Sequence, residues 1–132
     1  MPDSIPDSFR DMFDKPAIAN LATLMPDGHP QVTPVWCDFD GTFVRFNTSR
    51  GRQKERNLRR DPRVALSLLD PTNPYRYLEI RGRVIEITEQ GADQHADQLS
   101  KKYLGVEKYP FRQPGEVRLL CKLAVDRVRT QG

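Results

Sequence analysis

The chain has 132 residues, of which 37% are apolar and 30% are charged, and its formal net charge is +3. No apolar run approaches the roughly 20 residues of a membrane-spanning helix, and so small a net charge does not indicate a general nucleic-acid-binding coat. Six Phe, four Tyr and one Trp argue against a disordered chain, and 11 Pro with 8 Gly favour short strands over long helices. The length predicts a single domain, residues 1–132.

The chain begins with a short predicted helix, which Ser4 or Asp7 can cap and which ends near Asp14. Apolar alternation and turn-forming pairs then mark the strands. Asp27-Gly28 and Asp40-Gly41 are the expected turns of two early hairpins. In chain order, the six predicted strands are residues 17–25, 31–37, 43–48, 63–70, 75–88 and 117–125.

Two of these strands carry a signal of irregularity. Pro34 lies inside the strand 31–37 and cannot donate to a ladder, which predicts an edge strand or a bulge there. In the strand 75–88, the apolar residues change parity after Val84, close to Gly82. We therefore expect a bulge or a sharp bend near Gly82.

Two further helices are predicted between the strands. Residues 50–61 contain Leu58 as their only large apolar side chain, which predicts a short exposed helix. Residues 92–103 have apolar side chains at helical spacing, which predicts an amphipathic helix. Because six twisted strands with one buried face tend to close on themselves, the expected fold is mainly β, a small six-stranded antiparallel barrel with a few short helices.

The strongest local feature is a basic segment at residues 50–63. It contains seven cations and two anions, a local balance of +5, so the remainder of the chain sums to −2. The polar triplet at residues 47–49 precedes it, and hydroxyls with free backbone N–H groups at a strand-to-helix junction can form an anion site. A solvated helix face is the alternative interpretation. The seven cations are Arg50, Arg52, Lys54, Arg56, Arg59, Arg60 and Arg63.

Two weaker candidates concern planar ligands. The backbone around Pro34 is free to meet a flat polar ligand, although a plain edge strand would have the same sequence. Tyr75 and Tyr77 flank Arg76 after a Pro-rich loop, where aromatic rings can stack on a ligand, fill a subunit interface or simply pack.

Metal and hydrolytic chemistry are not indicated. His29 and His95 have no Cys or His at metal-ligand spacing, so both are expected to be solvated and no metal site is expected. Asp38 and Asp40 are expected to shape a hairpin turn. No phosphate-binding Gly-rich motif or serine nucleophile elbow occurs.

The cysteine content, the first residues and the size of the domain give expectations about the compartment and the oligomeric state. Cys37 and Cys121 cannot form a disulfide framework, and the first residues lack the basic and apolar stretches of a secretory leader. We therefore expect a cytoplasmic protein with two partly buried thiols in a reducing compartment. A domain of this size leaves much surface exposed, which favours oligomerisation.

Several short motifs, taken in order, resemble those of a known superfamily. They are Ala22-Thr23-Leu24, Asp27-Gly28, Pro30-Gln31-Val32, Val35-Trp36-Cys37, Arg52-Gln53-Lys54, residues 56–63 and residues 77–82. Together they resemble the FMN-binding split-barrel superfamily, typified by pyridoxamine 5′-phosphate oxidase, and within it the deazaflavin (coenzyme F420)-dependent reductases. The segment from Lys54 to Arg63 is the most specific part of the resemblance.

The resemblance implies a split barrel that forms homodimers, with two cofactors bound in grooves at the subunit interface. It places the cofactor phosphate at Arg52 and Lys54, the ring system along the strand 31–36, and the partner's cofactor near Tyr75 and Tyr77. The implied cofactor-binding residues are Gln31, Val32, Thr33, Pro34, Val35, Trp36, Asn47, Thr48, Ser49, Arg52, Lys54, Asn57, Tyr75 and Tyr77.

The implied activity is hydride transfer between reduced F420 and a small organic acceptor, with the reactive chemistry supplied by the cofactor. An FMN-dependent oxidoreductase and a non-catalytic flavin-binding protein are the alternatives. F420 is favoured because seven cations suit its longer anionic tail better than a single phosphate. Single-stranded nucleic acid is not an expected partner, because residues 50–63 contain no aromatic side chain. No residue is predicted as an obligatory acid or base; solvent or a tyrosine could deliver the proton.

Overall fold

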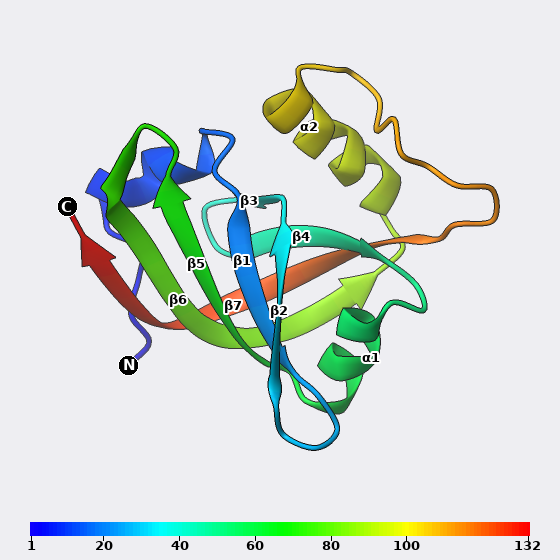
Figure 1. The fold of residues 1–132 in the computed structure, drawn as a ribbon, viewed down its shortest axis with the longest axis horizontal. Helices are drawn as coiled ribbons and strands as arrows, with labels where there is room; N and C mark the ends of the chain where they lie inside the picture. The colour runs from blue at the N-terminus through cyan, green and yellow to red at the C-terminus, as the bar shows by residue number, and fades with distance from the viewer.

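The computed structural model of residues 1–132 has one seven-stranded antiparallel sheet and three short helices (Figure 1). The strand order is β2-β1-β5-β6-β7-β4-β3. No helix is long enough and apolar enough to pass through a membrane. In chain order the elements are the 3₁₀ helix η1 (Asp7–Phe13), β1 (Ala19–Leu24), β2 (Pro30–Val35), β3 (Cys37–Phe39), β4 (Val44–Ser49), α1 (Gln53–Arg60), β5 (Arg63–Asp70), β6 (Asn73–Thr88), α2 (Ala92–Leu104) and β7 (Arg118–Gln131).

The seventh strand corrects the prediction of six. The predicted strand 31–37 is two strands, β2 and β3, which are separated only by Trp36 and lie at opposite edges of the sheet. The sheet therefore curls back on itself into a half-barrel whose two edges are joined through one residue (Figure 1). The prediction of an edge strand at Pro34 is confirmed, since the missing N–H falls in β2, which pairs on one side only.

Contacts with α2 explain why the chain leaves the sheet at Trp36. The Trp36 ring stacks on the Tyr103 ring, with centroids 5.2 Å apart and an interplanar angle of 9°. The Tyr103 hydroxyl accepts a hydrogen bond from Cys37 N–H at 3.1 Å and donates to the Ala17 carbonyl at 2.7 Å. These groups would otherwise need ladder partners, so the tyrosine takes the place of a neighbouring strand.

The core lies inside the curl of the sheet. The apolar side of the first helix is buried as expected, with Phe9, Met12 and Phe13 facing the core. This helix is a 3₁₀ helix that begins after Pro6, and neither Ser4 nor Asp7 caps it with a side chain. The backbone itself makes the first bond, from Phe9 N–H to Pro6 O at 2.9 Å, so no side-chain cap forms.

The bend in β6 is confirmed. The pairing with β7 shifts register between Arg81 and Gly82, and again between Val84 and Glu86. A Cβ atom added to Gly82 would lie 2.1 Å from the Ala124 carbonyl oxygen, so only glycine permits this close approach. The preceding loop is shorter than predicted, because Asp70 already pairs with Asn73 in the β5–β6 hairpin.

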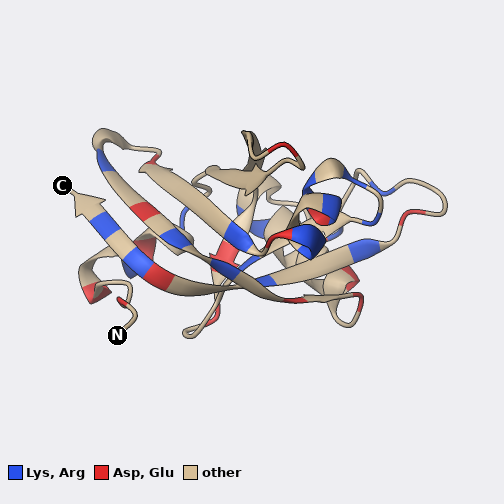
Figure 2. Cartoon of the chain, turned by 90° about the horizontal axis from the view of Figure 1, so that it is seen from below, with Lys and Arg blue, Asp and Glu red and all other residues tan.

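Charged residues are spread over the molecule. Figure 2 shows Lys and Arg interleaved with Asp and Glu along the strands as well as on the helices. Both thiols are free and fully buried rather than partly buried. Burial raises the pKa of Cys37 and of Cys121 to about 12.

Candidate functional site

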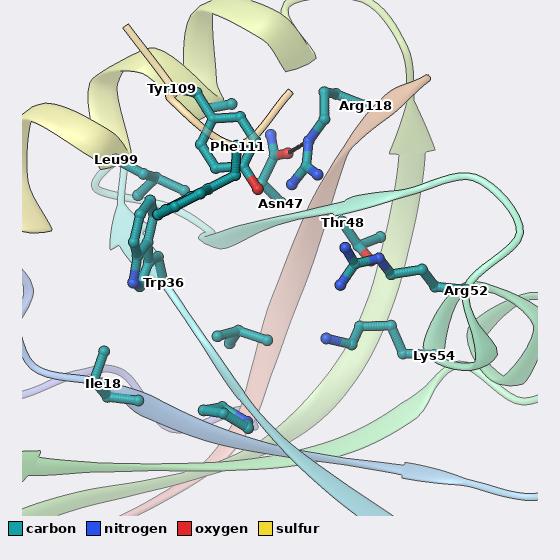
Figure 3. A pocket seen from close by; sticks show the side chains of 13 residues that line it. Ile18, Trp36, Asn47, Thr48, Arg52, Lys54, Leu99, Tyr109, Phe111 and Arg118 are labelled. Carbon is teal, nitrogen blue, oxygen red and sulfur yellow. Dashed lines mark hydrogen bonds between the residues drawn. The ribbon is translucent and has the colours of Figure 1, made fainter. Parts of the chain in front are cut away.

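A cavity of about 350 Å³ opens where the β2–β3 junction, the end of β4, the start of α1, α2 and the start of β7 meet (Figure 3). Its volume is in the range of small-molecule sites. No Asp or Glu lines it. The lining residues are Ile18, Pro34, Val35, Trp36, Asn47, Thr48, Arg52, Lys54, Ala96, Leu99, Tyr109, Phe111 and Arg118.

One end of the cavity is cationic. Arg52, Lys54 and Arg118 all contribute to it, and Figure 3 shows Thr48 among them. Burial lowers the pKa of Lys54, and the positive charges of Arg52 and Arg118 lower it further. Three cations and no carboxylate line this end of the cavity, so its lining carries a net positive charge.

Thr48 provides an independent indication of a missing polar partner. Its side chain is buried, and its hydroxyl oxygen has no hydrogen-bond partner in the protein. An unsatisfied buried hydroxyl costs about 1–3 kcal/mol, and native proteins rarely keep one without a reason. A phosphate oxygen at the cationic end would supply the partner.

The other end of the cavity is aromatic and apolar. Tyr109 meets Trp36 edge-to-face, with centroids 6.1 Å apart, and meets Phe111 in the same way at 5.7 Å. Phe111 is 56% exposed although it is a large apolar side chain. Leu99 and Ile18 complete this wall (Figure 3). A flat ring system fits such a wall.

The basic segment is divided by the fold. Only Arg52 and Lys54 face the cavity. Arg52 is held there by a hydrogen bond from its Nε to Ser49 Oγ at 2.9 Å. The other five are engaged by groups outside the cavity: Arg50 by Glu89, Arg56 by the Gly51 carbonyl, Arg59 by Glu55, Arg60 by the Leu24 carbonyl and Arg63 by Asp61.

The seven cations were expected to favour a long anionic ligand, but five of them bond to protein groups, so fewer positive charges are available to such a ligand. The helix is also less exposed than predicted, because Glu55, Asn57 and Leu58 are buried. Glu55 accepts a hydrogen bond from Gly51 N–H at 2.8 Å and satisfies the turn before the helix.

Seven of the fourteen predicted cofactor-binding residues line the cavity: Pro34, Val35, Trp36, Asn47, Thr48, Arg52 and Lys54. The others do not line it. Ser49 holds Arg52, and Asn57 is buried with its amide donating to Thr23 Oγ1 at 3.0 Å, which links α1 to β1. The first half of β2 contains Gln31, Val32 and Thr33, which come before the cavity-lining Pro34 and Val35. The β5–β6 hairpin with Tyr75 and Tyr77 lies across the molecule from α1 (Figure 1).

Sequence reasoning missed Arg118 and His95. Arg118 lies in the predicted strand 117–125 and was not among the predicted site residues, but it is only 8% exposed and lines the cavity. His95 was expected in solvent, yet it is 2% exposed and packs between Asn47 and Asp38. Asp38 accepts hydrogen bonds from Arg45 and lies beside His95, so it does not shape the turn. Asp40 does shape it, accepting from Thr42 and Phe43 N–H. No local sequence pattern predicts that Arg118 and His95 are buried, because the elements that cover them come from other parts of the chain.

Comparison with known proteins decides the family. Residues 5–132 match the family described as pyridoxamine 5′-phosphate oxidase. The chain belongs to this family. Its members commonly are oxidoreductases that bind flavin-type cofactors in the split-barrel fold.

Solved structures agree with this assignment. A protein described as an F420 reductase is 34% identical, with a TM-score of 0.84 over 95% of this chain and 98% of that one. A conserved hypothetical protein from Mycobacterium tuberculosis is 24% identical, with a TM-score of 0.76 over 97% and 85% of the two chains. HupZ from group A Streptococcus is 18% identical, with a TM-score of 0.69 over 96% and 94%; these two show the fold alone.

Proposed function

We propose that this protein is an F420-dependent oxidoreductase that transfers a hydride between the reduced deazaflavin and a small organic acceptor. The observation that carries the proposal is the two-ended cavity: an acid-free cationic end with an unsatisfied Thr48 hydroxyl, and an aromatic wall for a flat ring. These residues fit a cofactor that joins a phosphorylated chain to a planar ring system. A flavin-type cofactor follows from the family, and the 34% identity to an F420 reductase favours the deazaflavin.

FMN is the second candidate, because its single phosphate matches the few cations that face the cavity. Five of the seven cations of the basic segment bond to protein groups instead. A non-catalytic flavin-binding protein would use the same cavity. These candidates differ in which cofactor binds and in whether turnover follows.

The side chains have separable tasks in the proposed reaction. When bound, the cofactor would supply the hydride chemistry. Arg52 and Lys54 would hold the phosphate, and the aromatic wall would orient the ring and exclude water. Within the lining, only the Lys54 ammonium and the Tyr109 hydroxyl, besides the arginines, carry a proton that can be passed to an acceptor; solvent through the open mouth is the other source.

We further propose a homodimer with a cofactor at each subunit interface. Tyr75 is 76% exposed and Tyr77 36% exposed, at the opposite side of the molecule from their own chain's cationic end (Figure 1). Only a second copy can bring these rings to a cofactor. Val32 and Ile85, 64% and 48% exposed, are further apolar side chains that a partner would cover.

Titration of the purified protein with F420 and, in parallel, with FMN tests the cofactor proposal. Trp36 is the only tryptophan and lines the cavity, so quenching of its fluorescence reports binding directly. We expect tighter binding of F420 and at least a tenfold loss in the Arg52→Ala/Lys54→Ala double variant, since charge-assisted bonds to phosphate contribute about 1.5–3 kcal/mol each. The matched control is Arg63→Ala, whose ion pair with Asp61 lies outside the cavity.

The outcomes separate the candidates. Preference for FMN assigns the second candidate, and binding of neither cofactor refutes the proposal. If F420 binds, oxidation of its reduced form with a panel of quinone, enone and tetrapyrrole acceptors distinguishes an enzyme from a carrier. Sedimentation at micromolar concentration with cofactor present tests the dimer, and a monomer would contradict the shared site.

A further inference from the structure

Arg118 lines the cavity but lies outside the basic segment, and hydrogen bonds hold its buried side chain in place. It is the first residue of β7 and pairs across the ladder with Ser49, at the end of β4. Its Nε donates to Asn47 Oδ1 at 2.8 Å and its Nη1 to Glu116 Oε1 at 3.2 Å. Its guanidinium carbon lies 4.8 Å from the Tyr109 ring centroid. Figure 3 shows the terminal nitrogens directed into the cavity, and Nη2 is left for a ligand.

A row of polar side chains fixes the orientation of the Asn47 amide. The Asn47 nitrogen donates to the Ala92 carbonyl at 2.9 Å and lies 3.2 Å from His95 Nδ1. Because its nitrogen is used in this way, the amide presents its oxygen to Arg118.

The row continues beyond the histidine. His95 Nε2 lies 3.2 Å from Asp38 Oδ2, and Arg45 binds both Asp38 oxygens at 2.8 Å. With Nδ1 receiving the Asn47 amide, the ring proton belongs on Nε2, facing the carboxylate. The contact between His95 Nε2 and Asp38 is close, but it lacks hydrogen-bond geometry. The row Asp38–His95–Asn47 thus fixes the Asn47 amide through hydrogen bonds and places the Asp38 carboxylate beside the histidine.

We infer that Arg118 is the third cation of an anion site shared with Arg52 and Lys54, and that Asp38, His95 and Asn47 are positioning residues that aim its guanidinium. The ligand class is a phosphate ester. The identity of the molecule that carries this ester rests on the proposed function, whereas the anion site itself does not.

Three observations favour an anion site over a purely structural ion pair. Glu116 engages only Nη1 of Arg118, and it does not line the cavity. Lys54 shares this lining with Arg118, and its pKa is lowered first by burial, then by the charge of Arg52 and, to a smaller extent, by the charge of Arg118. The buried Thr48 hydroxyl, also in this lining, lacks a partner that a phosphate oxygen would provide.

Calorimetric titration with inorganic pyrophosphate, FMN and riboflavin tests this inference, because riboflavin is FMN without the phosphate. In Arg118→Gln we expect affinity for pyrophosphate and FMN to fall about ten- to a hundredfold, with riboflavin within twofold of wild type. Arg118→Lys, which keeps the charge, is expected to retain part of the affinity. Arg63→Gln is the control, since it removes an arginine outside the cavity.

The positioning role has its own pair of variants. His95→Asn can still accept from Asn47 and is expected to preserve the preference for FMN over riboflavin, whereas His95→Leu removes the acceptor and is expected to reduce it. Asn47→Asp would place a carboxylate beside Arg118 and is expected to abolish pyrophosphate binding. Equal preference for FMN in both His95 variants would remove the positioning role.

The results also separate this inference from the proposed function. If pyrophosphate binds through Arg118 but neither F420 nor FMN binds, the anion site stands and the cofactor proposal fails. If Arg118→Gln weakens FMN and riboflavin by the same factor, or leaves pyrophosphate binding unchanged, the inference is overturned. The inference is also overturned if the wild-type protein binds none of the three ligands, pyrophosphate, FMN and F420.

Discussion

Removing the Tyr103 hydroxyl tests how the half-barrel is held together at Trp36. In Tyr103→Phe the ring remains and can still stack on Trp36, but two backbone groups lose their partner. Cys37 N–H loses its acceptor, and the Ala17 carbonyl loses its donor. Both residues are buried, at 0% and 1% exposure, so water cannot easily replace the hydroxyl. The Cys37 carbonyl keeps the Lys102 ammonium as a donor.

The magnitude follows from the number of groups left unsatisfied. Each buried backbone group without a partner costs about 1–3 kcal/mol. Tyr103 itself is only half-buried, so some water can approach, and we expect a total loss of about 2–4 kcal/mol in the free energy of unfolding. For a chain of this size that corresponds to a decrease in Tm of roughly 10 °C.

Urea unfolding followed by Trp36 fluorescence measures this loss, because the only tryptophan lies at the perturbed junction. Tyr109→Phe is the matched control, since the Tyr109 ring also contacts Trp36 while its hydroxyl takes no part in the junction. We expect the control to stay within about 0.5 kcal/mol of wild type. A Tyr103→Phe protein as stable as the control would refute the idea that this hydroxyl replaces a strand.

Three further predictions concern stability and reactivity. Gly82→Ala should lower the free energy of unfolding by about 2 kcal/mol or more in a urea titration, because the added Cβ would collide with the Ala124 carbonyl; an unchanged midpoint would mean that the bulge relaxes freely. Burial tends to raise the pKa of Asp38, but its hydrogen bonds outweigh burial and lower the pKa to about 2. Its contribution, up to about 2 kcal/mol, is therefore present above about pH 4 and lost as the pH falls toward 2, so the stability difference between wild type and Asp38→Asn should shrink over that interval; a constant difference would contradict the assignment. Cys37 and Cys121 should resist a thiol reagent in the native protein and react on unfolding, and rapid native labelling would show that the core opens.

Local sequence patterns determined most of the strands and turns. Apolar alternation predicted the strand 43–48, in which Val44 and Phe46 are both buried, and Asp40 accepts the two hydrogen bonds that close its turn. Pro34 marked an edge because it has no N–H to donate to a second neighbour, and Gly82 marked a bulge because only a residue without Cβ allows the close approach to the Ala124 carbonyl. These sequence patterns depend only on neighbouring residues, so they can be recognised without knowledge of the rest of the fold.

The candidate site was only partly predictable for the same reason. The polar triplet before a basic segment located Thr48, and the family resemblance selected Arg52 and Lys54. Composition could not show which of the other cations would bond to protein groups. Two of those partners, Glu89 for Arg50 and the Leu24 carbonyl for Arg60, lie far away in the sequence. The partners of Arg56, Arg59 and Arg63 lie within five residues, but the folded turn and helix bring them into contact.

The sequence by itself determined the strand pattern, the family resemblance and one side of the cationic end. Only the tertiary structure decided that the chain crosses the barrel at Trp36, that His95 is buried, and that Arg118 joins Arg52 and Lys54 from the opposite end of the sequence. The physical reason is that burial and ion pairing depend on what covers a side chain. Here the cover comes from α2 and from the pairing of β4 with β7, in which partners such as Ser49 and Arg118 are far apart in the sequence.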